Sequence, residues 1–330
     1  MKKILAFALL LAVLSMTVFV GCKARESGLP EIGVAIYKFD DTFMSYTRNA
    51  IEQNAQGKAT ITTVDSQNAQ PTQNDQVDQF ITKKMKSIAI NPVDRTAAGV
   101  IVDKAKAGNV PVVFFNREPF PEDMNKWEKV YYVGAKAEES GTMQGQIAAE
   151  WWIENKGRDQ VLRYIMLMGE PGHQDAELRT EYSIKAVREA GIEVHQLAID
   201  TAMWDRPRAV DKMDAFWARF GDEIDMVFCN NDDMALGVIE SLRKVGFFTG
   251  GRYLPVVGVD ATAPALQALS EGTLLGTVLN DAKNQGKATF DIAYSLANGL
   301  APTTTAGTME GKYVWVPYQK VTRDNYRDFQ

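Results

Sequence analysis

The sequence predicts an α/β fold in which two doubly wound parallel sheets form separate lobes. From residue 32 onward, short β-rich runs such as IGVAIYKF and VPVVFFN alternate with segments of helical periodicity such as MSYTRNAIEQNA. Several β-rich runs are almost entirely apolar, which is typical of parallel strands covered by helices on both faces. A chain of 330 residues with so many strands exceeds one ordinary core, so two domains are expected.

The individual elements follow in order along the chain. Runs rich in β-branched and aromatic residues predict strands at 32–39, 59–65, 87–91, 110–116, 129–134, 161–167, 192–200, 225–230, 254–260 and 274–280. Apolar residues at helical spacing predict helices between them, among others at 44–55, 97–108, 208–220 and 233–246. Repeated strand–helix units of this kind predict mainly parallel sheets with helices on both faces.

The first 21 residues differ from the rest of the chain. Lys2 and Lys3 precede a long apolar run, and Gly21 and Cys22 follow it. This order is typical of an export signal, and a cysteine directly after a small residue is typical of bacterial lipoproteins. We therefore expect residues 1–21 to be a lipoprotein signal peptide, Cys22 to carry lipid that anchors the chain at a membrane, and residues 22–30 to be a tether. A retained transmembrane anchor and a plain cleaved signal are the alternatives.

Composition excludes several classes of function. The net charge is −6 and no basic stripe is present, so a nucleic-acid-binding surface is not expected. Besides Cys22 the only cysteine is Cys229, which ends an apolar run and is expected to serve packing. Two histidines in the whole chain are too few for a zinc site. His195 falls within a predicted strand, where a structural or surface position is expected.

Familiar catalytic motifs are absent, but unusual polar and aromatic residues follow nearly every predicted strand. In open α/β sheets, ligands bind outside the carboxyl ends of the strands. Helix caps also use Asp and Asn, so only the concentration of such residues indicates a site. The candidate ligand-binding residues are Asp41, Phe43, Asn116, His173, Asp175, Arg179, Trp204, Asn231, Asp260 and Asn280.

This mixture of side chains fits a sugar. Each sugar hydroxyl both donates and accepts, so carboxylates can accept its proton while Arg and amide groups donate to its oxygen. The apolar C–H faces of the ring suit flat aromatic surfaces, which Phe43 and Trp204 could supply. Carboxylates around a sugar could also belong to a sugar-active hydrolase, which remains the alternative.

Several stretches together resemble the bacterial glucose/galactose-binding proteins. They include IGVAIYKFDDTFMS, AINPVD, VPVVFFNREP, GEPGHQDAELR, DTAMWD, NNDDMALG and GTVLNDAKNQGKATFD. The resemblance implies a type I periplasmic binding protein fold, joined by a three-stranded hinge, that closes on D-glucose or D-galactose without being an enzyme. It also implies a periplasmic monomer that serves an ABC transporter and, in many relatives, a chemotaxis receptor. Sugar repressors of related fold carry an N-terminal helix-turn-helix, whereas this chain begins with an export signal.

The resemblance also assigns limits and roles. The expected lobes are residues 31–135 with 280–315, and residues 136–279 with 316–330. Eight of the candidates would hydrogen-bond the sugar, and Phe43 and Trp204 would sandwich it. Many relatives carry a calcium loop of the form D-x-[DN]-x-[DN]-G, whereas this chain reads WWIENKGRDQVLRYIML with Asp159 as its only Asp. We therefore expect no metal and no cofactor, although Asp225 lies near the position of the family's distant acidic ligand.

Overall fold

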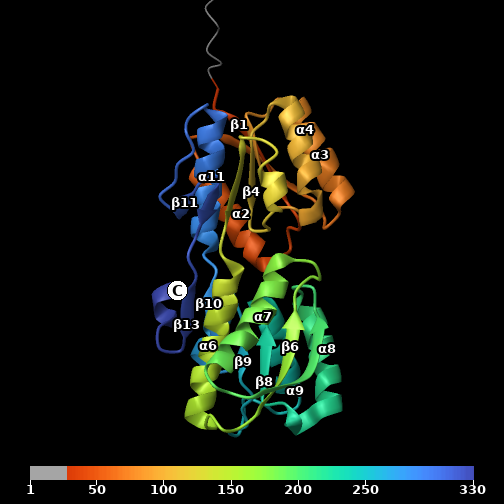
Figure 1. The fold of residues 1–330 in the computed structure, drawn as a ribbon, viewed down its shortest axis with the longest axis vertical. Helices are drawn as coiled ribbons and strands as arrows, with labels where there is room; N and C mark the ends of the chain where they lie inside the picture. Colours follow the sequence, from red (N-terminus) through yellow and green to blue (C-terminus); the bar gives the residue numbers. More distant parts are fainter. Residues whose placement is uncertain (1–27) are drawn as a thin grey trace, which may run out of the picture.

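The computed structural model describes residues 28–330, which form two α/β lobes stacked along the long axis of the molecule (Figure 1). The predicted signal peptide, the lipidation site at Cys22 and most of the predicted tether lie outside the described residues. Within residues 28–330, no helix combines the length and the apolar character that a membrane span requires.

The N-terminal lobe is built on a seven-stranded sheet in the described chain, with strand order β11-β12-β5-β4-β3-β1-β2. All neighbouring strands are parallel except the edge pair β11 and β12. The strands are β1 (Glu31–Ile36), β2 (Thr60–Asp65), β3 (Ser87–Ile90), β4 (Val112–Phe115), β5 (Val130–Gly134), β11 (Thr308–Glu310) and β12 (Tyr313–Trp315).

Helices cover both faces of this sheet, which explains why its central strands are apolar throughout. On β1, Ile32 and Val34 face a core shared with α2 and α11, whereas Ala35 faces the opposite core, shared with α3 and α4. Phe114 and Phe115 on β4 are both fully buried, one in each core. The helices are α2 (Thr42–Ala55), α3 (Gln70–Thr82), η1 (Arg95–Ala97), α4 (Ala98–Gly108), α5 (Pro121–Met124) and α11 (Ala282–Ala297).

The C-terminal lobe repeats this plan on a six-stranded sheet of the described residues, with order β13-β10-β9-β8-β6-β7. Only β13 is antiparallel to its neighbour. The strands are β6 (Leu162–Met168), β7 (Val194–Thr201), β8 (Met226–Cys229), β9 (Val256–Val257), β10 (Gly276–Leu279) and β13 (Gln319–Thr322). The helices are α6 (Ala137–Asn155), α7 (Gln174–Glu189), α8 (Arg206–Phe220), η2 (Gly221–Glu223), α9 (Asp232–Lys244), α10 (Ala263–Glu271) and η3 (Tyr326–Phe329).

The two-lobed doubly wound fold predicted from the sequence is confirmed. The chain passes between the sheets three times, after β5, after β10 and after β12, and α11 returns to the N-terminal lobe (Figure 1). The limits of each lobe stay a prediction. Cys229 ends β8 in the core, where burial raises the pKa of its thiol well above the ordinary value, and His195 is exposed on β7.

Candidate functional site

A cavity lies between the lobes, and all ten candidate residues line it. Those of the N-terminal lobe follow β1 and β4, and those of the C-terminal lobe follow β6, β7, β8, β9 and β10. The carboxyl ends of both sheets therefore meet at one cavity, as open α/β sheets predict. Tyr37, Met44 and Arg117 also line it, and the sequence analysis did not identify them.

In the N-terminal lobe, Asp41 and Asn116 are held by local structure. Asp41 is the N-cap of α2, and its Oδ1 accepts a 2.8 Å hydrogen bond from the Met44 amide. Asn116 follows β4 directly in a left-handed conformation (φ 61°), and its side-chain oxygen accepts a hydrogen bond from Asn91. Phe43 is buried at the start of α2 and reaches both the cavity and the lobe core. Oriented oxygens beside a flat ring suit a sugar.

In the C-terminal lobe, His173 is the N-cap of α7. Its Nδ1 accepts a 3.1 Å hydrogen bond from the Asp175 amide, so in the neutral ring the proton resides on Nε2. Burial lowers the pKa of His173 well below its ordinary value, and Arg117 and Arg179 lower it further. His173 is therefore neutral at pH 7 and offers the cavity one donor.

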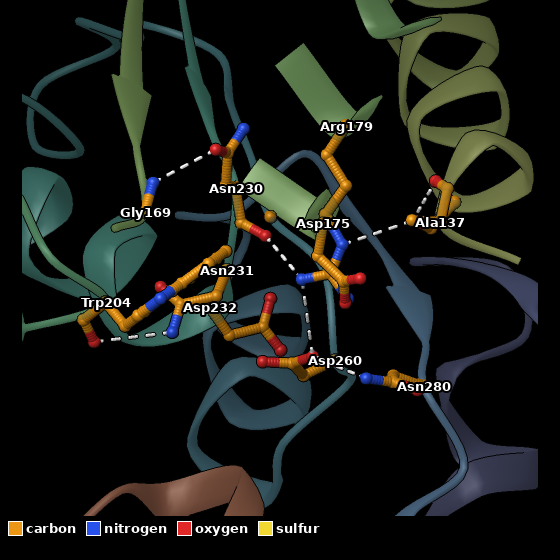
Figure 2. Close-up of polar contacts among 12 residues, drawn as sticks. Ala137, Gly169, Asp175, Arg179, Trp204, Asn230, Asn231, Asp232, Asp260 and Asn280 are labelled. Atoms are coloured by element: carbon orange, nitrogen blue, oxygen red, sulfur yellow. Dashed lines mark hydrogen bonds and ion pairs between the residues drawn. The ribbon is translucent and has the colours of Figure 1, made fainter. Parts of the chain in front are cut away.

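Arg179 lies at the centre of the C-terminal half of the site and is only 3% exposed (Figure 2). Its guanidinium forms an ion pair with Asp175 at 3.0 Å and lies 4.0 Å from Asp260. It also donates to the Asn230 carbonyl at 2.9 Å. Burial opposes the charge on Arg179, but the neighbouring Tyr318 and the two carboxylates raise its pKa above the ordinary value. A fixed cation thus compensates the buried carboxylates of the site.

Asp260 and Asn280 form the floor of the site beside Arg179 (Figure 2). Asn280 donates a 3.3 Å hydrogen bond to Asp260 and in turn accepts one of 2.5 Å from Gln285. Burial raises the pKa of Asp260 well above its ordinary value, although Arg179 lowers it. Close to it, Asp232 is fully buried, accepts hydrogen bonds from two threonines, and has a pKa raised by burial to about 6. Asp232 supports the floor without lining the cavity.

Trp204 forms an aromatic wall that closely packed neighbours hold in place. It has a left-handed backbone (φ 63°), and its carbonyl accepts a 3.4 Å hydrogen bond from Asn231. The His173 ring meets its edge at a centroid distance of 5.1 Å. A Cβ on Gly169 would lie 2.1 Å from the indole ring, so only glycine leaves room for it. Non-glycine residues with positive φ cost energy and tend to occur at functional sites.

Two contacts cross the lobe boundary beside this cavity. Arg117 of the N-terminal lobe pairs with Glu170 of the C-terminal lobe at 2.9 Å, and Gln174 donates to Glu118 at 2.9 Å across the same boundary. Burial raises the pKa of Glu118, which Gln174 partly offsets. Both contacts require the lobes to be together, so the structure shows a closed arrangement.

The neutral state of His173 predicts a pH dependence of ligand binding. Because the buried ring excludes a proton, an open state that binds one competes with closure as pH falls below the ordinary histidine pKa of about 6.5. Above that pH, His173 is neutral in both states and its protonation no longer affects ligand binding. Arg95, Arg117, Arg179 and the Asp175 carboxylate surround the ring, so the titration of carboxylates must be separated from that of His173.

His173→Asn provides that separation, since asparagine also caps helices. Dissociation constants of both proteins, measured by calorimetry from pH 8 to pH 5, give a ratio in which carboxylate effects cancel. We expect the affinity of the wild type, relative to the variant, to fall up to about tenfold per pH unit below pH 6.5. If the ratio of the two dissociation constants does not change with pH, His173 is not the group responsible for the pH dependence.

Asp225, which the sequence resemblance placed near the family's distant calcium ligand, has a protein partner in the structure. Asp225 forms an ion pair with Arg163, whose Nε lies 2.8 Å and whose Nη2 lies 2.9 Å from its carboxylate oxygens. Such a bidentate pair uses both oxygens of the acid. Among residues 28–330, no group of three or more His, Cys, Asp or Glu side chains is arranged to hold a metal ion.

Comparison with known proteins agrees with this geometry. The family model described as "Periplasmic binding protein domain" matches residues 32–301. The chain is 44% identical over 306 residues to the D-galactose/methyl-galactoside binding periplasmic protein MglB of Haemophilus influenzae, covering 90% of this chain and 91% of that protein. It is 33% identical to a putative rhizopine-binding protein of Rhizobium meliloti, covering 91% of this chain and 92% of the relative.

Solved structures give the same result. An ABC transporter solute binding protein from Bacillus halodurans with bound myo-inositol superposes with a TM-score of 0.80 at 31% identity, covering 92% of this chain and 98% of the other. The matched family model spans both lobes and the cavity between them. The chain therefore belongs to the periplasmic binding protein family, whose members include the sugar-binding proteins of ABC transporters.

Proposed function

We propose that this protein captures D-galactose or D-glucose between its lobes and delivers the sugar to an ABC transporter. The observation that carries the proposal is the cavity itself. Carboxylates, amides, two buried arginines and the aromatic side chains of Tyr37, Phe43 and Trp204 converge there from both lobes. The similarity to MglB of Haemophilus influenzae, named for D-galactose and methyl-galactoside binding, supports this ligand class.

The mechanism is closure of the lobes around the ligand. A sugar can contact Asp41 and Asn116 of one lobe and Arg179 and Asp260 of the other at the same time only when the lobes are together. Binding therefore shifts the population toward the closed state. The closed shape is the signal that a transporter can read.

The required affinity is physically reasonable. Micromolar binding corresponds to about 8 kcal/mol. Spread over about 12 non-hydrogen atoms of a hexose, this is roughly 0.7 kcal/mol per atom, below the ceiling of about 1.5 kcal/mol for very small ligands. A missing hydroxyl would leave a buried group unpaired at a cost of about 1–3 kcal/mol, which explains how such a site selects its ligand.

Calorimetric titration tests the proposal. The chain from Lys23 onward, which contains every described residue, is unfolded and refolded to remove carried-over ligand and is then titrated with D-galactose and D-glucose. Saturable 1:1 binding at micromolar or tighter affinity is expected for at least one of them. Absence of heat and of a melting shift with both sugars would contradict the proposal and indicate another small polar ligand.

We also propose that the protein has no enzymatic activity. The carboxylates of the cavity are already engaged: Asp41 by Tyr37 and Met44, Asp175 by Arg179, and Asp260 by Asn280. A glycosidase needs one carboxyl free to donate a proton and room for a leaving group. Incubation with nitrophenyl glycosides should give no nitrophenol, and turnover would favour the hydrolase alternative.

The periplasmic location follows from the family, and we propose in addition that lipid on Cys22 anchors the mature chain to a membrane. Substitution of Cys22 by serine should release the protein from the membrane fraction into the soluble fraction of the periplasm. Retention of the Cys22→Ser protein at the membrane would instead favour a transmembrane anchor. A monomeric state and a chemotaxis receptor as second partner belong to the same proposal.

Calcium independence is a further expected result. We propose that the Arg163–Asp225 pair takes the place of a structural calcium ion, since the guanidinium already compensates the charge of the carboxylate and occupies the bidentate approach to both of its oxygens. The melting temperature should be the same in about 1 mM calcium as in the presence of a chelator, because a bound metal would raise it. A stabilisation by calcium of several degrees would contradict this proposal.

A further inference from the structure

Tyr37 lines the sugar cavity but has no assigned role. It directly follows β1, is 5% exposed, and donates a 2.5 Å hydrogen bond from its hydroxyl to Oδ2 of Asp41. The other carboxylate oxygen, Oδ1, accepts the amide of Met44. The two donors approach different oxygens, so together they fix the plane of the Asp41 carboxylate.

The hydroxyl of Tyr37 acts as a donor throughout the ordinary pH range. Burial raises the pKa of Tyr37 well above its usual value, and the nearby Asp41 raises it further. The phenol therefore keeps its proton and directs it at Asp41. With both oxygens oriented in this way, only the remaining lone pairs of Asp41 can accept a sugar hydroxyl.

Arg117 holds the ring of Tyr37 in place. Its guanidinium carbon lies 3.9 Å from the ring centroid, and its Nη1 donates to the Val93 carbonyl at 2.5 Å. Its Nη2 forms the 2.9 Å ion pair with Glu170 of the other lobe. Arg117 is itself 5% exposed, so these contacts fix it between the lobes. A continuous series of contacts thus leads from Glu170 through Arg117 and Tyr37 to Asp41.

We propose that Tyr37 is a positioning residue that orients the Asp41 carboxylate toward one hydroxyl of the bound sugar, with Arg117 and Glu170 completing its support when the lobes close. The inference rests on the proposed sugar-binding function. Because acceptor geometry at a carboxylate is directional, loss of the Tyr37 hydroxyl affects recognition of that one hydroxyl and not of the sugar as a whole. Tyr37 is then a determinant of specificity that acts through Asp41.

The test compares wild type and Tyr37→Phe by calorimetry with D-galactose, D-glucose and the monodeoxy derivatives of the better-bound sugar, each lacking one hydroxyl. Tyr37→Phe is expected to weaken binding of the parent sugar roughly tenfold. With one monodeoxy derivative the two proteins should bind equally, because the hydroxyl that Asp41 accepts is missing. Asp41→Asn should weaken binding of the parent sugar as well, but it should bind this same derivative as tightly as the wild type does.

The possible outcomes separate the inference from the function on which it rests. Failure of the wild type to bind either hexose would overturn the proposed function. If the wild type binds and Tyr37→Phe weakens every sugar by one common factor, or weakens none, the positioning role is overturned. A selective effect on a hydroxyl other than the one identified by Asp41→Asn also overturns it.

Glu170→Gln tests the supporting contacts without altering a cavity-lining side chain. It removes the charge that fixes Arg117, so it should reproduce the selective pattern of Tyr37→Phe at smaller amplitude. An equal loss of affinity for all sugars would show that Glu170 serves closure alone, and it would overturn the proposed support of Tyr37 by Glu170 through Arg117. Glu177→Gln, an exposed position on α7, is the matched control and should leave every dissociation constant unchanged.

Discussion

Trp204→Ala is expected to weaken hexose binding roughly a hundredfold, about 2.7 kcal/mol, while the chain still folds. The indole forms one wall of the cavity, and its removal exposes the apolar face of the sugar to water. It also removes the ring against which His173 packs. Titration with D-galactose and D-glucose measures the loss, and circular dichroism with a melting curve checks the fold.

Trp217→Ala is the matched control for this prediction. Trp217 lies on α8 in the same lobe, packs against Phe247 at a centroid distance of 5.1 Å, and does not line the cavity. It should lower the melting temperature through lost packing and leave the affinity for sugar unchanged. Normal binding by Trp204→Ala, or an equal loss in both variants, would contradict the assignment of Trp204 to the site.

Much of the candidate site could be predicted from sequence because its signals are local. Asp41, His173 and Asn231 each follow a strand and cap the next helix, so strand order and cap chemistry identify them together. All ten candidates line one cavity, although their contacts with a sugar stay a prediction. The same logic explains the confirmed fold, since apolar strands between helices permit few other arrangements.

The residues that were missed depend on contacts between distant parts of the chain. Tyr37 falls inside the predicted strand 32–39, although β1 ends at Ile36, and Arg117 directly follows the predicted strand 110–116. Only their contacts with Asp41 and Glu170 reveal a role. Asp232 shows the opposite case, a residue whose sequence position suggests the site but whose side chain does not line the cavity. It adjoins Asn231 in sequence, yet it is fully buried and accepts hydrogen bonds from Thr262, the N-cap of α10, and from Thr277 of β10. Sequence position alone does not separate a supporting carboxylate from a ligand-binding one.

Arg179→Met is expected to have the largest effect on stability. It keeps most of the side-chain volume but leaves Asp175 and Asp260 without their buried cation. Breaking a buried ion pair by removing one partner costs about 3–5 kcal/mol. Chemical denaturation should show this loss at pH 7, and sugar binding should disappear because a charged donor is gone from the cavity.

The pH dependence of the Arg179→Met variant distinguishes this mechanism from simple loss of packing. Burial already raises the pKa values of Asp175 and Asp260, and without Arg179 these values rise further. A carboxyl whose pKa is higher in the folded than in the unfolded chain destabilises the fold most above the folded pKa, and not at all below the unfolded value. The deficit in the free energy of unfolding should therefore shrink as pH falls from 7 toward 4.

Two further variants complete this argument. Arg243→Met removes a surface arginine whose ion pair with Glu271 is exposed, so it should cost at most about 1 kcal/mol with no effect on binding. Adding Asp175→Asn to Arg179→Met removes one uncompensated charge and should restore part of the stability, but not the affinity for sugar. If the deficit is independent of pH and the second substitution restores nothing, Arg179 stabilises the lobe through its volume and not through its charge.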